Sequence, residues 1–388
     1  MTSSGADDRR ARCRDNGAVP GLVTVLRSWG RIGCLGFGGP PAHIRLLRDL
    51  CVDREGWIDA DEFEDAVATC NLLPGPSSTQ LAIFTAWRVR GVAGAVVGGL
   101  AFIVPGLVAI LALAALFLSG PPDWVLGAGA GAGAAVAAVA VHAGWGLTPA
   151  SWSRRASVRW FAYLVAGGIA AALLGPWVVV VLLGCGGIEL AIRHPARDLS
   201  AIVPLAALGG ATVSVGVLVS LAWTSFKVGA LSYGGGFVII PLMQSDAVTE
   251  HGWMTGPEFL NAVALGQITP GPVVHTVAVV GYAAAGLVGG LLAAVVAFGP
   301  SFAFVLLGGR HFDRLRADAR VQAFLGGAGP AAIGAIFGSA VPLAGEITEP
   351  WQYAVLAGAA VALLVLRRGV VSVLVTAALV GVAVTLAT

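Results

Sequence analysis

Two cations stand inside otherwise apolar runs of this 388-residue chain. Arg31 lies in VTVLRSWGRIGCLGFGG and Lys227 lies in SLAWTSFKVGALSYGGG, each two residues before a glycine. A cation at the centre of a membrane costs about 2.5–3.5 kcal/mol on insertion scales, so such residues usually have a function. A pair of them would suit a multiply charged anion. The alternative is that both side chains extend along apolar surface to the water.

Glycine clusters follow both cations, and proline–glycine–proline segments follow the clusters. Each glycine costs a helix about 1 kcal/mol relative to alanine, so a cluster predicts a broken helix that lines a binding site. Each PGP segment predicts a break followed by a new helix N-terminus, where free N–H groups and the helix dipole attract anions. The alternatives are tight helix packing at the glycines and a simple kink at the prolines. The segments are GCLGFGGP (33–40), GALSYGGG (229–236), NLLPGP (71–76) and QITPGP (267–272).

These segments belong to an internal repeat. One offset of 196 residues aligns them without a gap, and 17 of the 44 positions in 33–76 are identical to their partners. Chance would give only about two to four identities, even with this biased composition. Duplicated Gly- and Pro-interrupted units predict a transporter whose site lies between the copies. The offset also pairs Glu62 with Glu258, which we interpret either as helix-start residues or as proton-coupling carboxylates.

Composition indicates an all-α, polytopic membrane protein. The chain is 57% hydrophobic and 11% charged, with a mean hydropathy of +0.85, whereas soluble domains carry roughly 25% charged residues. We expect a cytoplasmic tail at 1–20, a first repeat at 21–195, a connector helix at 196–222 and a second repeat at 223–388. The apolar spans are 91–119, 124–147, 158–174, 176–192, 201–222, 287–308, 321–343, 352–366 and 370–387.

The basic residues predict that the two repeats are inserted upside down relative to each other. Arg45, Arg48, Arg54, Arg88 and Arg90 match Pro241, Gln244, Glu250, Ala284 and Gly286, which are uncharged or acidic. Later in the repeats the pattern reverses. The basic stretch RLRADAR (314–320) follows the second-half span 287–308, whereas the matching first-half stretch LFLSGPPDW (116–124) has no Lys or Arg. Positive loops stay in the cytoplasm, so 88–90 and 310–320 are expected inside, and 120–123 and 284–286 outside. Random drift of charge is the alternative.

Other classes of site find little support. The five cysteines form no close pair, which argues against a disulfide framework or a metal site. The chain has no GxxxxGK[ST] sequence and therefore no nucleotide-driven motor of its own. We expect no catalytic group, no cofactor and no nucleic-acid partner.

At these motifs the chain resembles the chromate ion transporter family. GFGGP…GW…EF…LPGPSSTQ and KVGALSYGGG…GW…EFL…ALGQITPGP look like the two halves of that family, and the resemblance covers essentially the whole chain. It implies export of chromate across the bacterial inner membrane and chromate resistance. Sulfate or another oxyanion is the alternative substrate, and a passive anion channel and a membrane-embedded chromate-reducing enzyme are rival classes. The expected partners are the anion, the lipid bilayer and a second copy of the chain in a homodimer.

The substrate-binding candidates combine the motif argument with this resemblance. In the first copy they are Arg31, Gly38, Gly39, Asn71, Pro74, Gly75, Pro76 and Ser77. In the second copy they are Lys227, Ser232, Tyr233, Gly234, Gly235, Gly236, Gln267, Pro270, Gly271, Pro272 and His275.

Overall fold

The computed structural model describes residues 20–71, 75–155, 157–194, 216–232, 237–308 and 318–387. Throughout these ranges every regular element is helical, which confirms the predicted all-α class. In the first half the α-helices are α2 (Leu22–Leu35), α3 (Pro40–Arg48), α4 (Ala60–Cys70), α5 (Ser77–Leu118), α6 (Asp123–Arg155), α7 (Val158–Ile169) and α8 (Val178–Arg193). In the second half they are α9 (Val217–Leu231), α10 (Ile240–Gln244), α11 (Gly256–Ile268), α12 (Thr276–Gly308), α14 (Ala319–Gly345), α15 (Pro350–Ala360) and α16 (Val370–Ala387).

Short 3₁₀ and π turns extend several of these helices. They are η1 (Asp49–Arg54), η2 (Ala170–Leu174), η3 (Gly175–Trp177), η5 (Phe237–Ile239), η6 (Ser245–Glu250), η7 (Val273–His275) and η9 (Val361–Val365).

The chain breaks where the motifs predict. In the first copy α2 ends at Leu35, and Gly38 and Gly39 take φ values of +98° and +72° before α3 begins. The first PGP segment leads directly into α5, with Pro76 as its N-cap. Pro272 occupies the same place before η7 and α12. The glycine cluster of the second copy, Tyr233–Gly236, lies outside the described residues, as does Pro74.

The helices α5 and α12 each contain a sharp reversal. In α5, Arg90 (φ −141°) and Gly91 (φ +63°) leave the helical conformation, and in α12 Ala285 (φ −152°) and Gly286 (φ +61°) do the same. A positive φ of this kind is available to glycine at little cost, which explains the residue type at both reversals. Beyond the PGP segments the offset between the copies is therefore 195, so Arg90 matches Ala285 and not Gly286 as the constant offset predicted.

Close contacts across each reversal establish that the chain doubles back. A Cβ built on Gly94 would collide with the carbonyl oxygen of Ala86, and one built on Gly281 would collide with Gly289. Residues eight apart in a straight helix lie about 12 Å from each other. The segments 77–118 and 273–308 are therefore helical hairpins, each with a short first arm and a long second arm.

The predicted apolar spans largely reappear as helices. Within the described ranges five helices are long and apolar enough to cross a membrane, and two of them are the hairpins. Shorter apolar helices occupy 158–174, 217–231 and 350–365. Most of the connector expected at 196–222 lies outside the described residues, and from Val217 onward this stretch is the beginning of α9.

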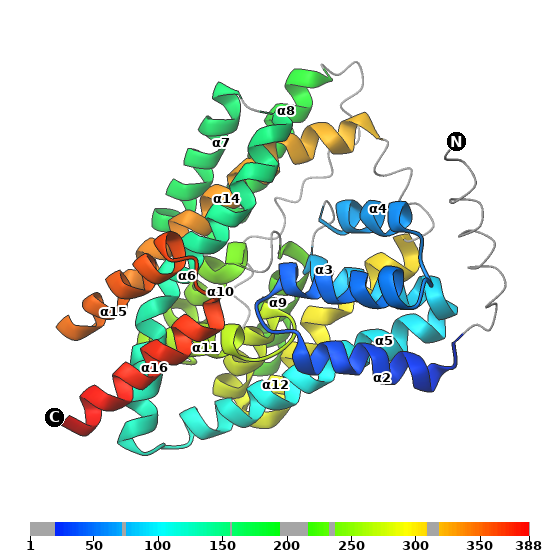
Figure 1. The fold of residues 1–388 in the computed structure, drawn as a ribbon. Coiled ribbons are helices and arrows are strands. Elements are labelled where there is room, and N and C mark those ends of the chain that lie inside the picture. The colour runs from blue at the N-terminus through cyan, green and yellow to red at the C-terminus, as the bar shows by residue number, and fades with distance from the viewer. Residues whose placement is uncertain are drawn as a thin grey trace, which may run out of the picture.

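Matching helices from both halves mix in space (Figure 1). One bundle is built on the hairpins: α2 packs on α5, α9 packs on α12, and α5 and α12 contact each other. The other is built on α6 and α14, which also contact each other. There the halves exchange helices, because α6 packs against α15 and α16 whereas α14 packs against α7 and α8. The repeats in the sequence are therefore not separate bodies in space.

Candidate functional site

The two PGP segments and the two broken helices meet in crossed pairs. The backbone N–H of Gly75, from the first PGP segment, donates to the carbonyl oxygen of Ser232 at 2.6 Å. Gly271, from the second PGP segment, donates to the carbonyl oxygen of Gly36 at 3.0 Å. The 196-residue offset pairs Gly75 with Gly271 and Gly36 with Ser232. We call the Gly36–Gly271 contact the first crossing and the Gly75–Ser232 contact the second crossing.

A buried histidine reinforces the first crossing. Nε2 of His43, on α3, donates to the same Gly36 carbonyl oxygen at 2.8 Å. The His43 ring meets the edge of Phe102, and the His275 ring meets Phe298 in a similar edge-on contact. Both histidine side chains are fully buried. Two imidazoles therefore stand beside this backbone contact, one from each half of the chain.

Several buried polar atoms at the crossings have no hydrogen-bond partner among the described residues. They include the hydroxyls of Thr79 and Ser232, the amide nitrogen of Gln267 and both ring nitrogens of His275. Buried polar groups are nearly always paired, so each orphan needs an explanation such as an absent ion or water. Thr79 and His275 each lie in the first turn after a PGP segment, one in each half of the chain. Unpaired donors therefore gather where the motifs predict an anion-binding helix N-terminus.

Lys227 is held by a carboxylate that the sequence motifs do not include. Its Nζ lies 2.5 Å from Oδ2 of Asp246, and the hydroxyl of Thr224 donates to the same oxygen at 2.8 Å. The Asp246 side chain is 1% exposed and that of Lys227 is 19% exposed. Oδ1 of Asp246 has no partner among the described residues. The cation is thus neutralised inside the protein.

Arg31 differs from its counterpart. Its side chain is exposed and forms no ion pair within the part of the chain that the structure describes. The position that matches Asp246 is Leu50, which is buried in the hydrophobic core. The two predicted cations are therefore in different electrostatic environments.

The matched glutamates both sit in the first turn of a helix. Glu258 forms a capping box with Thr255, whose backbone N–H donates to Glu258 Oε2 at 2.7 Å. Glu62 stands in the first turn of α4, where Asp59 is the N-cap, and pairs with Arg88 beside the α5 reversal. Both carboxylates therefore have ordinary partners at helix ends.

The remaining candidates are spread over the two crossings. Ser77 and Gln267 are buried, Asn71 is exposed at the end of α4, and Gly39 lies against Val273 of the other half. Pro270 is half-buried. The structure thus brings Gly75 to Ser232 and the second PGP segment to the first broken helix, while Lys227 pairs with Asp246.

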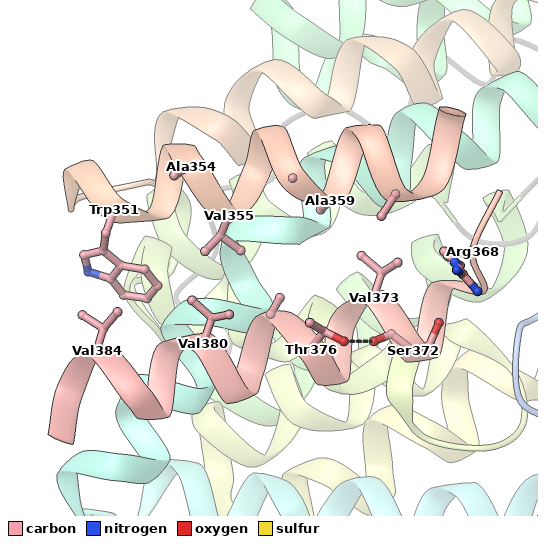
Figure 2. Close-up of a pocket in the computed structure, with 13 residues that line it drawn as sticks. Trp351, Ala354, Val355, Ala359, Arg368, Ser372, Val373, Thr376, Val380 and Val384 are labelled. Atoms are coloured by element: carbon pink, nitrogen blue, oxygen red, sulfur yellow. Dashed lines mark hydrogen bonds between the residues drawn. The ribbon is translucent and has the colours of Figure 1, made fainter. Parts of the chain in front are cut away.

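A cavity lies away from these residues. It has a volume of ≈ 730 Å³ and opens between α15 and α16, where Figure 2 shows mostly apolar side chains between Trp351 and Arg368. None of the predicted site residues lines it. In the described part of the chain no group of three or more His, Cys, Asp or Glu side chains is placed to hold a metal ion.

Motif analysis missed two residues that the structure places at the site, His43 and Asp246. Neither is duplicated, because Ile239 matches His43 and Leu50 matches Asp246. A search for identities between copies cannot find such residues. The available signal was the carboxylate of Asp246, which follows the apolar run FVIIPLM after only two residues.

Comparisons with known proteins assign the family. The chromate transporter family matches this chain twice, over residues 23–189 and 219–382. The chain is 32% identical to a chromate transport protein of Cupriavidus metallidurans, covering 86% of this chain and 85% of that one. It is 32% identical to a chromate transport protein of Pseudomonas aeruginosa, covering 86% and 84%. A probable chromate transport protein of Synechococcus elongatus is 30% identical, covering 83% and 84%.

No solved structure shows a significant match to this fold. The sequence matches extend over both halves and over all the motifs described above, and the long apolar helices are those of a protein that crosses a membrane several times. This chain is therefore a multi-pass membrane protein that belongs to the chromate transporter family.

Proposed function

We propose that this protein exports chromate, a tetrahedral dianion, from the cell across the bacterial inner membrane and thereby confers chromate resistance. The observation that carries the proposal is the pair of crossings, where unpaired buried donors surround the first turns of two helices. Thr79 lies in the first turn after the first PGP segment and His275 in the first turn after the second, so each half of the chain contributes a side chain there. The names of the relatives favour chromate as the substrate.

The helix N-termini at the crossings supply the first part of the binding energy. Each carries a partial charge of about +0.5 and backbone N–H groups that no helical carbonyl accepts. Ser77 and Val273 begin the two helical segments after the PGP prolines. Two such termini facing one anion would neutralise about half of its double charge. Arg31 and Lys227 together would more than neutralise the other half.

The membrane potential is sufficient to drive export without nucleotide hydrolysis. Moving one charge across about 100 mV is worth about 2.3 kcal/mol, so a dianion that leaves a negative-inside cell gains about 4.6 kcal/mol. This corresponds to a concentration ratio of roughly a thousandfold or more.

The inverted arrangement of the repeats is part of the proposal. The crossed hydrogen bonds and exchanged helices support it, because matching elements of the two halves make matching contacts. In transporters built this way the substrate binds near the bilayer midplane, between the repeats. Alternating access then consists of opening one crossing while the other stays closed.

Chromate flux into everted membrane vesicles tests the proposal. An interior-positive potential should accelerate accumulation of chromate, and an excess of sulfate should compete if sulfate shares the site. Chromium should be recovered in its original oxidation state, whereas a reductase would convert it. Preloaded unlabelled chromate should accelerate uptake by counterflow, which a passive channel does not show. Potential-independent flux, equal to that of vesicles without the protein, would refute the proposal.

A further inference from the structure

The ion pair between Lys227 and Asp246 connects two elements of the second half inside the hairpin bundle. Lys227 is on α9 and Asp246 is on η6, and Thr224 adds a second donor to Asp246 from one turn earlier on α9. Removing one member of such a buried pair leaves an uncompensated charge, so neither member can simply be released. This pairing conflicts with the requirement that Lys227 bind an anion.

We propose that Asp246 is the proton-binding group of this transporter: its carboxylate competes with the transported anion for Lys227, so that binding of one anion is coupled to uptake of one proton. The inference rests on the proposed function, because it assumes that an oxyanion reaches Lys227.

Charge arithmetic supports this exchange. With Asp246 ionised, a dianion at Lys227 would bring three negative charges to one ammonium group in a poorly hydrated interior. Like charges at such distances disfavour each other's ionised forms strongly. If Asp246 takes a proton from water, the carboxyl group becomes neutral and the ammonium group can turn to the anion. Loss of that proton restores the ion pair and expels the anion.

The hydrogen bonding of Asp246 provides a place for the proton. Both donors, Lys227 and Thr224, are directed to Oδ2. Oδ1 is buried and has no partner among the described residues. A proton on Oδ1 leaves the Thr224 hydrogen bond intact and breaks no covalent bond. Only the ammonium contact is lost, and the anion replaces it.

The other charged groups near this pair do not substitute for Asp246. The elements packed against η6 and α10 are α9, α11, α14, η3 and η5. Their other titratable or charged side chains, with those on η6 and just beyond these elements, are Glu250, His251, Glu258, Asp318, Arg320 and Glu346. Of these, only Glu346 is connected to α10, because its Oε1 accepts a hydrogen bond from Gln244 at 2.8 Å. Lys227 is the only charged partner of Asp246 among the described residues.

Proton coupling is confined to the second copy of the repeat. Leu50 stands where the first copy would need a carboxylate, and Arg31 has no ion-pair partner in the described part of the chain. Arg31 can therefore bind an anion without releasing an internal competitor. The expected ratio is one proton per anion.

Binding of chromate to the purified full-length protein in nanodiscs tests the inference. Calorimetric titrations would cover an alkaline pH range in which chromate is almost wholly the dianion. If each anion takes up one proton, the apparent dissociation constant of the wild-type protein rises about tenfold per pH unit. Asp246→Asn should remove this slope and bind chromate at least as tightly as the wild type at the alkaline end. The exposed carboxylate Glu250 provides the matched control, and Glu250→Gln should keep the wild-type slope.

Three outcomes would overturn the coupling alone: a wild-type affinity that ignores pH, a slope that persists in Asp246→Asn, or an affinity loss in Asp246→Asn equal to that of Lys227→Gln at every pH. The last would make Asp246 a positioning residue. A wild-type protein that binds no chromate would overturn the proposed function, and the inference with it. If Asp246→Asn does not fold, Lys227→Gln/Asp246→Asn removes both charges and should bind weakly without a pH slope. Infrared difference spectra of the wild type should also show a protonated carboxyl band on chromate addition, and its absence would contradict the inference.

Discussion

The amide nitrogen of Gly75 lies 2.6 Å from the carbonyl oxygen of Ser232, so the first PGP segment is held by the broken helix of the other half. Gly271 and Gly36 make the matching contact at 3.0 Å. Each contact is one hydrogen bond, worth about 0.5–1.5 kcal/mol net. The first crossing also has the hydrogen bond from His43 to Gly36, so the two crossings are not held equally.

Removing the unpaired hydroxyl of Thr79 should weaken chromate binding without lowering the stability of the protein. Thr79→Val keeps the shape of a buried side chain and removes a polar atom that has no partner, so the melting temperature should stay the same or rise slightly. Loss of one hydrogen bond to the anion should raise the half-saturation for chromate about two- to tenfold. Flux measured over a range of concentrations and thermal unfolding in detergent provide the two readouts.

Thr85→Val is the control for this substitution. Thr85 is buried in the same arm of α5, but its hydroxyl donates to the carbonyl oxygens of Leu81 and Ala82. This variant should keep its affinity for chromate. Equal affinities in Thr79→Val and the wild type would remove Thr79 from the site.

Arg31→Gln should weaken chromate binding without unfolding the protein. The side chain is exposed and leaves no described ion-pair partner behind, so the melting temperature should change little. A charge-assisted hydrogen bond is worth roughly 1.5–3 kcal/mol, which predicts a ten- to hundredfold rise in half-saturation. Arg27 lies one turn earlier on α2 and is also exposed, but the equivalent residue in the second copy is Trp223, so this cation is not duplicated. Arg27→Gln is therefore the control and should keep the wild-type half-saturation. Unchanged half-saturation in Arg31→Gln would favour extension of this side chain to the water.

Gly33, where α2 packs on α5, and Gly229, where α9 packs on α12, should not tolerate a side chain. A Cβ on Gly33 would lie 2.7 Å from the carbonyl oxygen of Phe102, and one on Gly229 would collide with that of Ala297. Gly33→Val and Gly229→Val should each destabilise the protein by about 1–3 kcal/mol or more. At Gly146 an added Cβ meets nothing within 4 Å, so Gly146→Ala should be neutral or slightly stabilising. If Gly146→Ala lowered the melting temperature as much as the two valine variants do, the close helix packing at Gly33 and Gly229 would be contradicted.

The two hairpin reversals should face opposite sides of the membrane. Val92 and Leu287 occupy matching exposed positions immediately after the reversals. With single cysteines in a cysteine-free background, an impermeant maleimide added to whole cells should label Leu287→Cys and not Val92→Cys. Everted vesicles should give the reverse result. Labelling of both positions from the same side would contradict the inverted repeat.

The matched glutamates should not control the pH dependence of transport. Glu258→Gln weakens a capping box and should cost about 0.5–2 kcal/mol of stability. Glu62→Gln removes a largely exposed ion pair with Arg88 and should cost no more than about 1 kcal/mol. Both variants should keep the wild-type pH profile of chromate flux. A flattened profile in either one would identify that carboxylate as a proton-coupling group.

Much of the fold could be read from local pattern. The apolar runs placed most of the long helices to within a few residues, because the length of a spanning helix and its need for apolar side chains are set by the bilayer. Gly38, Gly39 and Pro76 marked real breaks, because their backbone preferences act within a few residues. The duplication showed which segments of the two halves are equivalent to each other.

The partners of those segments were decided by tertiary structure. The sequence did place boundaries at 88–90 and 284–286, but hydropathy records no direction, so it could not show that Gly91 and Gly286 reverse the chain there, nor that α6 and α14 exchange their neighbours. The pairing of Lys227 with Asp246 was also hidden, since the carboxylate occurs in only one copy and lies 19 residues further along the sequence. A charge in an apolar run signals that a partner is needed, because desolvation makes it costly alone. Which group supplies that partner depends on how the helices pack, and packing is a property of the whole chain.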